Sequence, residues 1–525
     1  MKFLKTTLAI LLISLTFNVQ GQTKIDTTFG EKGFRHYDFG GNNYAAALLT
    51  DAEDIYACVV NINNGRYVSR IIKFKEDGQH DSTFSGDGVL ELAQTGGRVS
   101  ISALAKHPDS SIVAVGWHSA GFGGADVYAA KFSTKGVLDA NFGTAGKKII
   151  DLNGTDIPSD VIINDIGQVS LYGYQTSGVI NQAFSLLLSA TGSLISTYGN
   201  GGISFFDFGN YTYFLNAIEV ENKAVLVCGG TDTLSSTYGL IAKIDSSGKL
   251  DKSFESDGKV LNNHSAGVTK SAVLGFTQET KKDTGFIWLY EETLNGKTVF
   301  YLGKNLRDGV KDSSFGTDGR VLLTPGAEGA KYLGVQTRGN VVVAFGHFNF
   351  DGTIAAFDIK TGRQLDAGLL ESAYNLTSNR PEDVRKATSP LHIKKDSKDR
   401  LVVLAQQRDT STNKIEVFVA SVILETKQAS SARYQTSFSS NARIIPNPSA
   451  GLEDVTIELE LKSIEDLKLS ISDVTGKQLE MVEFNSLKIG TNLLNISASY
   501  FPNKGFYFVH ITSSKGTKTL KLLRE

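Results

Sequence analysis

The chain has 525 residues, and its 53 lysine and arginine residues nearly balance its 55 aspartate and glutamate residues, which gives a net charge of −2 at pH 7. This balance excludes the strongly basic surface that binding to nucleic acid or to an anionic membrane would require. The 53 glycines far outnumber the 8 prolines, and 30 phenylalanines and 18 tyrosines are present. Such a composition is typical of many short β-strands connected by glycine turns.

The first 21 residues have the pattern of a signal peptide. Lys2 and Lys5 precede an apolar run from Leu8 to Phe17, and small or polar residues follow up to Gly21. The apolar run is too short to span a bilayer, and no later segment reaches that length. We therefore expect residues 1–21 to be a signal peptide, the mature protein to be exported, and the chain to have no transmembrane helix.

A short motif, called the joint below, recurs six times between residues 25 and 319. It combines an aspartate or another turn residue, an aromatic residue and a closing glycine. The aromatic residues are Phe29, Phe84, Phe142, Tyr198, Phe254 and Phe315. The polar residue can cap a turn, the aromatic ring can pack between repeats, and the glycine can adopt a positive φ. The spacing of 55 to 61 residues indicates a repeat architecture in which these aromatics are structural.

Short strand-like runs fill the sequence between joints. The second repeat contains four of them, which matches one blade of a β-propeller in a repeat of about 57 residues. A degraded seventh joint lies at residues 358–370, and one more strand-rich unit follows it. The first joint has no strands before it and the last unit has no joint after it, so each end can complete the other.

The predicted fold is therefore all-β, with a seven-bladed β-propeller over residues 22–425. Ring closure should pair the segment after Gly30 with the final strand near residues 417–424, because closure protects sheet edges. The two cysteines, Cys58 and Cys228, each lie 26 residues before the aromatic of their repeat. Equivalent positions three blades apart cannot reach disulfide distance, so both are expected to be buried free thiols.

The joints, of the form LDxSFGxDGxV, resemble the delta-60 repeat, a propeller-like repeat of secreted bacterial proteins. The resemblance covers roughly residues 22–425. It implies an architecture and assigns no chemistry.

The last hundred residues have a different pattern. Residues 426–443 are rich in serine and contain no acidic residue, which predicts an exposed linker. Alternating strand-like runs then predict a small β-sandwich over residues 444–525.

This C-terminal segment resembles the type A sorting domain of the type IX secretion system, although Ile445 stands where a tyrosine is usual. The matching residues are Pro446, Asn447, Pro448, Asp473, Gly476 and the run from Gly505. The resemblance implies that the type IX machinery of a Bacteroidota cell is a partner. It also implies export across the outer membrane, followed by release or by linkage to lipopolysaccharide.

Sequence motifs for catalysis, metal binding or phosphate binding are absent, and no cofactor is expected. Trp117 and His118 stand beside four glycines in the stretch 116–126 and are the candidate ligand-binding residues. They would be exposed in a long loop between two strands, and a loop without a ligand is the alternative interpretation.

Three joints carry a second acid six residues after the first: Asp81 with Asp87, Asp251 with Asp257, and Asp312 with Asp318. Calcium binding and turn capping would both explain these pairs. Three of the six joints lack one of the acids, and this favours turn capping.

Two classes of function remain. The favoured one is a binding or adhesion module for an unknown extracellular ligand, either a glycan or a protein, because the joints are uniform and no repeat carries an obvious acid, base or nucleophile. The alternative is an exported hydrolase or lyase with its active site at the propeller mouth. Two or three carboxylates that converge there with a histidine or a tyrosine would favour the enzyme.

Overall fold

A computed structural model describes residues 21–524 except 53, 94–96, 122, 233–236, 263–267, 279–284, 295–296, 324–329, 349–350, 363–385, 410–413, 427–441, 448, 450–453, 462–464, 474–477, 489 and 514–515. The expected signal peptide, most of the expected linker and most of the degraded joint lie outside the described residues. The regular structure of the described residues is β-strand with short 3₁₀ turns, and it contains no α-helix. The predicted all-β class is confirmed.

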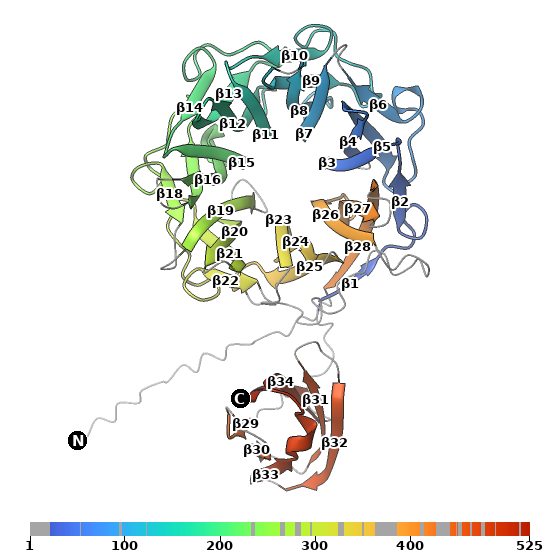
Figure 1. Cartoon of the computed structure of the whole chain (residues 1–525), viewed down its shortest axis with the longest axis vertical. Coiled ribbons are helices and arrows are strands. Elements are labelled where there is room, and N and C mark those ends of the chain that lie inside the picture. The colour runs from blue at the N-terminus through green and yellow to red at the C-terminus, as the bar shows by residue number, and fades with distance from the viewer. Residues whose placement is uncertain are drawn as a thin grey trace, which may run out of the picture. The chain divides into compact units, whose positions relative to one another are not determined.

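The chain divides into two compact units, Met1–Lys427 and Gln428–Glu525. We divide the described strands of the first unit into seven consecutive antiparallel groups, called sheets 1 to 7, of which sheets 3 and 4 are halves of one eight-stranded sheet (Figure 1). Sheet 1 contains β3 (Asn42–Asp51), β4 (Asp54–Asn63), β5 (Arg66–Lys75) and β6 (Val89–Leu92). Sheet 2 contains β7 (Arg98–Lys106), β8 (Ile112–Ser119), β9 (Asp126–Phe132) and β10 (Lys147–Ile150). Sheet 3 contains β11 (Thr155–Ile163), β12 (Val169–Ser177), β13 (Ile180–Leu188) and β14 (Ile203–Phe206).

Sheets 4 and 5 contain β15 (Tyr211–Glu219), β16 (Val225–Asp232), β17 (Thr237–Ile244) and β18 (Lys259–Asn262); β19 (Val268–Thr277), β20 (Gly285–Leu294), β21 (Lys297–Leu306) and β22 (Arg320–Leu323). Sheets 6 and 7 contain β23 (Ala330–Arg338), β24 (Val341–Phe348) and β25 (Asp351–Asp358); β26 (Lys386–Lys395), β27 (Leu401–Asp409) and β28 (Ile415–Thr426). One parallel pair, Asn181 with Tyr211, links sheets 3 and 4.

The first strands of the seven sheets contact one another in cyclic order. Each contacts the first strand of the next sheet, and β26 of sheet 7 contacts β3 of sheet 1. Figure 1 shows the resulting ring of sheets.

The N-terminal segment joins the last sheet, as the ring-closure argument predicted. Strands β1 (Gly21–Ile25) and β2 (Phe34–Tyr37) both pair antiparallel with β28. Phe34 lies opposite Ala420 and Tyr37 opposite Val417, within the range expected for this pairing. The predicted pairing of the segment after Gly30 with the final strand is therefore confirmed.

Every first strand carries a β-bulge at the same place. The register shifts at Ala45/Ala47, Ile101/Ala103, Pro158/Asp160, Phe214/Asn216, Val273/Gly275, Tyr332/Gly334 and Pro390/His392. Side chains at two of these bulges link neighbouring sheets, because Asn216 Nδ2 donates to Asp160 Oδ2 at 2.7 Å and Phe276 N donates to Asn216 Oδ1 at 3.0 Å. At these two bulges the bend aims a polar side chain at the neighbouring sheet.

The joints connect consecutive sheets to one another. All six joint aromatic side chains are buried. A glycine just before each later joint packs against the joint before it. At Gly136, where φ is +76°, an added Cβ would lie 2.7 Å from Ser85 N and 3.1 Å from the Phe84 ring. Backbone N–H groups of six joints also donate across to the next turn at 2.8 to 2.9 Å, for example Ser85 N to Lys135 O. These glycines therefore permit both the turn and a close contact between joints.

Cys58 and Cys228 are both buried and unbonded to each other, as expected. Burial raises the pKa of the Cys58 thiol well above its usual range. Both side chains belong to apolar clusters between neighbouring sheets. Their role is therefore packing.

The second unit consists of two sheets over one core. One sheet contains β29 (Ala442–Ile445), β30 (Val455–Leu461) and β33 (Gly490–Ile496), and the other contains β31 (Glu465–Asp473), β32 (Gln478–Leu487), β34 (Gly505–Ser513) and β35 (Gly516–Arg524). Buried side chains from both sheets form one apolar cluster, in which Ile457 and Leu469 are fully buried. This core contains no residue of the first unit.

Candidate functional site

The register of the strands defines two ends in each sheet. In sheet 1, Asn42 at the start of β3 pairs with Ile62 near the end of β4. The loop that enters the first strand and the loop between the second and third strands therefore lie together, at what we call the loop end. The joints and the loops between the first and second strands lie at the opposite end, called the joint end.

At the joint end, the acids have partners within the chain. Asp81 Oδ1 accepts hydrogen bonds from the Thr83 backbone N at 3.1 Å and hydroxyl at 2.7 Å, and Lys73 Nζ lies 3.2 Å from its Oδ2. Asp251 and Asp312 make the same contacts with a serine two residues on and a lysine eight residues before. Of the second acids, Asp87 and Asp257 accept from backbone N–H groups and Asp318 pairs with Lys311. These contacts support turn capping.

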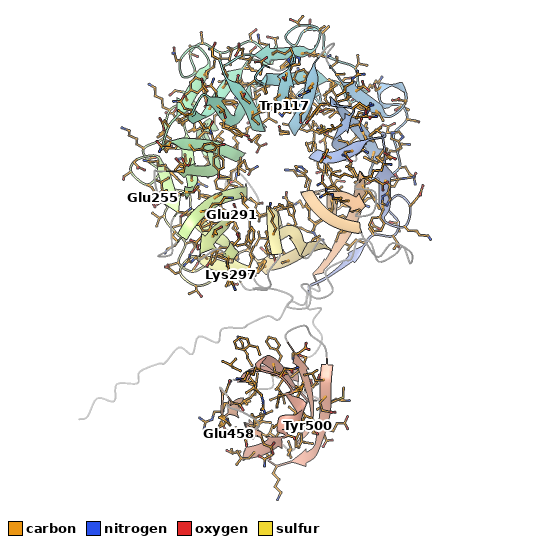
Figure 2. All side chains as sticks on the ribbon, viewed as in Figure 1. Trp117, Glu255, Glu291, Lys297, Glu458 and Tyr500 are labelled. Atoms are coloured by element: carbon orange, nitrogen blue, oxygen red, sulfur yellow. The ribbon has the colours of Figure 1, made fainter. Side chains whose placement is uncertain are left out.

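The structure places Trp117 and His118 in strand β8, and the loop begins only after Ser119. The expectation of two exposed loop residues is therefore wrong, because the pairing of β8 with β7 extends to Arg98 and Ser119. Trp117 is half-buried (Figure 2) and its ring lies 5.8 Å from that of Tyr67 in sheet 1. His118 is only 7 % exposed, and its Nδ1 has no hydrogen-bond partner.

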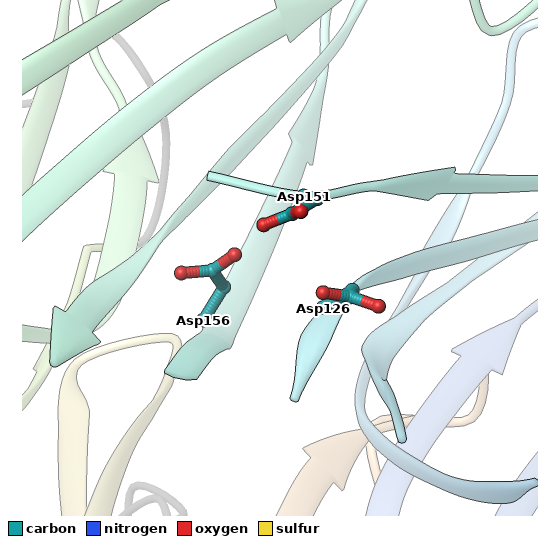
Figure 3. Close-up of side chains that lie close together, drawn as sticks. All are labelled: Asp126, Asp151 and Asp156. Carbon is teal, nitrogen blue, oxygen red and sulfur yellow. The ribbon is translucent and has the colours of Figure 1, made fainter. Parts of the chain in front are cut away.

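Three carboxylates converge beside His118 at the loop end, between sheets 2 and 3 (Figure 3). Asp126 is the first residue of β9, Asp151 follows β10, and Asp156 is the second residue of β11. One oxygen from each lies within 4.8 Å of the others, and we call this group the acid cluster. His118 Nδ1 is 4.0 Å from Asp126 Oδ2.

The hydrogen bonds of the acid cluster leave part of it unsatisfied. Asp151 Oδ1 accepts from Asn153 N at 2.6 Å, and Asp156 Oδ2 accepts from Leu152 N at 2.7 Å. The amide nitrogen of Gln175, opposite Asp156 on β12, donates to the Leu152 carbonyl oxygen. Asp156 is 0 % exposed, yet its Oδ1 has no hydrogen-bond partner. A buried carboxylate oxygen without a partner is costly unless something else compensates it.

The pKa values reflect this environment. Burial raises the pKa of Asp156 to about 6; the Leu152 backbone N and the Gln175 side chain oppose this rise, and the charges of Asp151 and Asp126 add to it. Burial also raises the pKa of Asp126, helped by the charge of Asp151 and opposed by His118.

Replacing Asp156 with asparagine should stabilise the protein at pH 7 in the absence of added metal ions. A carboxyl pKa that is higher in the folded state than in the unfolded state destabilises the fold when the group is ionised. This penalty is present above about pH 6 and disappears as the pH falls below about 4. Each pKa unit corresponds to about 1.4 kcal/mol, so we expect a gain of about 2–3 kcal/mol. Asn43 occupies the equivalent position in sheet 1, and its Oδ1 accepts from Phe39 N, so asparagine fits this turn.

Urea unfolding of the parent and of Asp156→Asn at pH 7 and pH 4 measures this difference. The gain should appear at pH 7 and vanish at pH 4. Asp207→Asn, at the corresponding turn before sheet 4, is the control and should change neither value. A loss of stability at pH 7 in Asp156→Asn would contradict the assignment.

A polar hollow of about 500 Å³, called the asparagine pocket, lies at the loop end of sheet 1. Its lining residues are Phe39, Asn61, Asn63, Asn64, Arg66, Val68, Arg70 and Glu91. The Arg70 guanidinium donates to Asn61 Oδ1 and to Glu91 Oε2, each at 3.0 Å, and stacks 4.8 Å above the Phe39 ring. Asn63, Asn64 and Arg66 are exposed.

The sequence did not single out the acid cluster or this pocket. One signal was available for the cluster, because the turn that enters the first strand repeats an aspartate followed by an apolar residue. Asp38, Asp151 and Asp207 each accept a hydrogen bond from the backbone N two residues later. Comparison of these turns would have drawn attention to Asp156, which has Asn43 and Thr212 as counterparts.

Among the sorting-signal residues, Asn447 is anchored to the last strand. Its Nδ2 donates to Lys521 O at 2.6 Å, and its Oδ1 accepts from Leu523 N at 3.0 Å. Pro446 precedes it, Asp473 ends β31 and Gly505 begins β34. Pro448 and Gly476 lie outside the described residues.

A family model described as a secretion system C-terminal sorting domain matches residues 443–525. The protein is therefore exported, through an interaction with the type IX secretion machinery, and is secreted or held at the cell surface. Within the part of the chain that the structure describes, no helix has the length and apolar character needed to cross a membrane.

Several solved structures resemble the chain at low identity. Drosophila Semaphorin 2a is 9 % identical and aligns over 97 % of this chain and 100 % of its own, with a TM-score of 0.47. The polysaccharide lyase Uly1 is 11 % identical over 75 % of this chain and 93 % of its own, with a TM-score of 0.40. A protein of unknown function from Dyadobacter fermentans DSM 18053 is 11 % identical over 77 % and 99 %, with a TM-score of 0.35. No curated protein matches the chain.

Proposed function

We propose that residues 22–425 form a seven-bladed β-propeller of delta-60-like repeats that acts outside the cell as a binding module for a polar ligand, most simply a glycan. In this proposal residues 1–21 are a signal peptide and the C-terminal unit, a type A sorting domain, delivers the module. The cyclic contacts of the seven first strands support the propeller. No metal or cofactor takes part in ligand recognition as proposed.

The observation that carries the binding function is the asparagine pocket. Asparagine amides and an arginine guanidinium offer hydrogen-bond donors and acceptors in a polar hollow, which suits the hydroxyl groups of a sugar. Arg70 is held by three partners and is part of the wall. The exposed Asn63 and Arg66 are therefore the side chains that a ligand would meet.

The alternative, an exported hydrolase or lyase, has one observation in its favour. Three carboxylates and a histidine do converge, as such an enzyme would need. However, Asp156 and His118 are buried, and Asp126 and Asp151 belong to a third strand and to the loop after a fourth strand rather than to the first strands. Catalytic carboxylates must reach the substrate, so the arrangement favours a binding function.

A glycan array probed with the purified protein tests the proposal. For a glycan that binds, Asn63→Ala and Arg66→Ala should each weaken binding at least tenfold, since each removes hydrogen bonds to the ligand. Asn141→Ala, an exposed change at the joint end, is the matched control and should leave binding unchanged. Unaltered affinity in both pocket variants would overturn the assignment of the pocket, and release of cleaved glycan products would favour the enzyme.

A further inference from the structure

We propose that the acid cluster of Asp126, Asp151 and Asp156 binds a single divalent cation, calcium in preference to magnesium. This site lies between sheets 2 and 3, apart from the asparagine pocket in sheet 1. It is independent of the proposed binding function.

The first argument is uncompensated charge. Among the described residues, no lysine or arginine forms an ion pair with any of the three carboxylates, and His118 is the one basic side chain within 4.0 Å of them. Two buried polar atoms point to a missing partner, Asp156 Oδ1 and His118 Nδ1, since neither has a hydrogen bond. Buried charges in proteins are paired or coordinate metals.

The second argument comes from equivalent positions at other junctions between sheets. Because the strand registers match, Asp126, opposite His118, corresponds to Glu416, opposite Gln407 in sheet 7. Asp151 and Asp156 correspond to Asp38 and Asn43, which follow β2 and begin β3.

At that junction of sheets 7 and 1, a lysine supplies the positive charge. Lys414 Nζ lies 2.5 Å from Asp38 Oδ2 and 3.8 Å from Glu416 Oε1. Two carboxylates there share one ammonium group, whereas the acid cluster has three carboxylates and no ammonium group among the described residues. A bound cation would occupy the role that Lys414 has in sheet 7.

The third argument is that the turn itself does not need a carboxylate at position 156. Asp156 Oδ2 accepts from Leu152 N, but Asn43 Oδ1 accepts from Phe39 N and Thr212 Oγ1 accepts from Phe208 N in the same way. A neutral residue therefore caps this turn in two other repeats. The charge of Asp156 serves something other than the turn.

The ligand chemistry selects calcium. Carboxylate oxygens are hard ligands, and calcium–oxygen bonds of about 2.3–2.6 Å allow oxygens on opposite sides of one ion to be up to about 5 Å apart. The three oxygens of the acid cluster lie within 4.8 Å of one another, which is close to the separations between the ligands of one calcium ion. Magnesium requires bonds of about 2.0–2.1 Å in strict octahedral geometry, which this irregular set of loops and strands suits less well.

The test is a calorimetric titration of the full-length, chelator-treated protein with calcium chloride, paired with thermal unfolding. We expect one ion per chain and a rise in melting temperature with calcium. Asp151→Asn should weaken calcium binding at least tenfold and abolish the temperature rise. It should still fold, because asparagine can keep the bond from Asn153 N and the side chain is exposed.

Asp207→Asn is the matched control, because Asp207 has the same turn position and hydrogen bond but does not belong to the acid cluster. It should bind calcium as the parent does. The proposal is overturned if the parent binds no calcium, if magnesium binds as tightly, or if Asp207→Asn and Asp151→Asn lose calcium equally. Failure of glycan binding in the pocket test would leave the calcium result untouched, so the two proposals are separable.

Discussion

Replacing Phe142 with alanine should lower the free energy of unfolding of the first unit by about 3–5 kcal/mol, as for other buried aromatic side chains. Phe142 is fully buried. Its apolar cluster contains Val113 and Val115 of sheet 2 and Leu171 and Phe184 of sheet 3, so the ring fills the space between two sheets. Alanine would leave a cavity at this junction, because the backbone hydrogen bonds of the joint fix the spacing between the two sheets.

Denaturant unfolding followed by circular dichroism measures this loss. Asn141→Ala is the neighbouring control, since Asn141 is exposed in the same joint and only its backbone N donates to Asp139. It should change stability by less than about 0.5 kcal/mol. Equal unfolding midpoints for Phe142→Ala and the parent would show that the joint aromatic does not hold the sheets together.

The repeat pattern was readable from the sequence because each joint uses the same local chemistry. In five of the six joints an aspartate caps its own turn, and in all six a glycine adopts a positive φ and an aromatic ring packs beside it, within nine residues. Pairing of β2 with β28 could also be predicted, since an orphan joint at one end and a missing joint at the other leave few alternatives. The seventh joint falls mostly outside the described residues; of its described part, Ile359 packs against the cluster of Phe315 and the Thr361 carbonyl oxygen accepts from Gly316 N.

Features that depend on pairing between strands could not be predicted from the sequence. The residue skipped at the bulge is a leucine in four first strands and a serine or an alanine in the other three, and residues so common in strands do not mark a bulge in the sequence. The lysines that pair with joint aspartates lie on the neighbouring strand eight residues earlier, and their side chains reach the turn only because of the strand register. Trp117 and His118 were assigned to a loop because glycines follow them, although β8 extends through both.

The acid cluster could not be predicted from the sequence either, because its residues come from different strands and loops. Asp126 and Asp151 are 25 residues apart in the sequence and meet only because β10 pairs with β9. Asp156 belongs to the next sheet and joins them through the packing of β11 against sheet 2. Local motifs cannot reveal a group that is assembled across a junction.

The two ends of the sheets differ in a way that bears on function. The joint end repeats the same aspartate–lysine ion pair at four of the six joints. The loop end places an asparagine pair in sheet 1, His118 in sheet 2, the acid cluster between sheets 2 and 3, and a threonine pair in sheet 4. A uniform end serves assembly, whereas a varied end can distinguish ligands.

Removing residues 444–525 should abolish export across the outer membrane and leave a folded first unit in the periplasm. The sorting domain is the part of the chain that the secretion machinery recognises. The buried apolar clusters of the first unit end at Val422, and the buried cluster of the second unit begins at Ile444. Among the described residues, the two units therefore have separate cores. The truncated protein should therefore fold but should not be exported across the outer membrane.

Cell fractionation in the native host, with circular dichroism of the purified truncated protein, measures both halves of this prediction. The complementary fusion attaches residues 426–525 to a periplasmic reporter protein, which should then reach the surface or the medium because the sorting unit folds around its own core. A truncated protein that still reached the surface or the medium at parental levels would show that the ring itself carries the export signal. An unfolded truncated protein would show instead that the first unit depends on the second, against the separation of their cores.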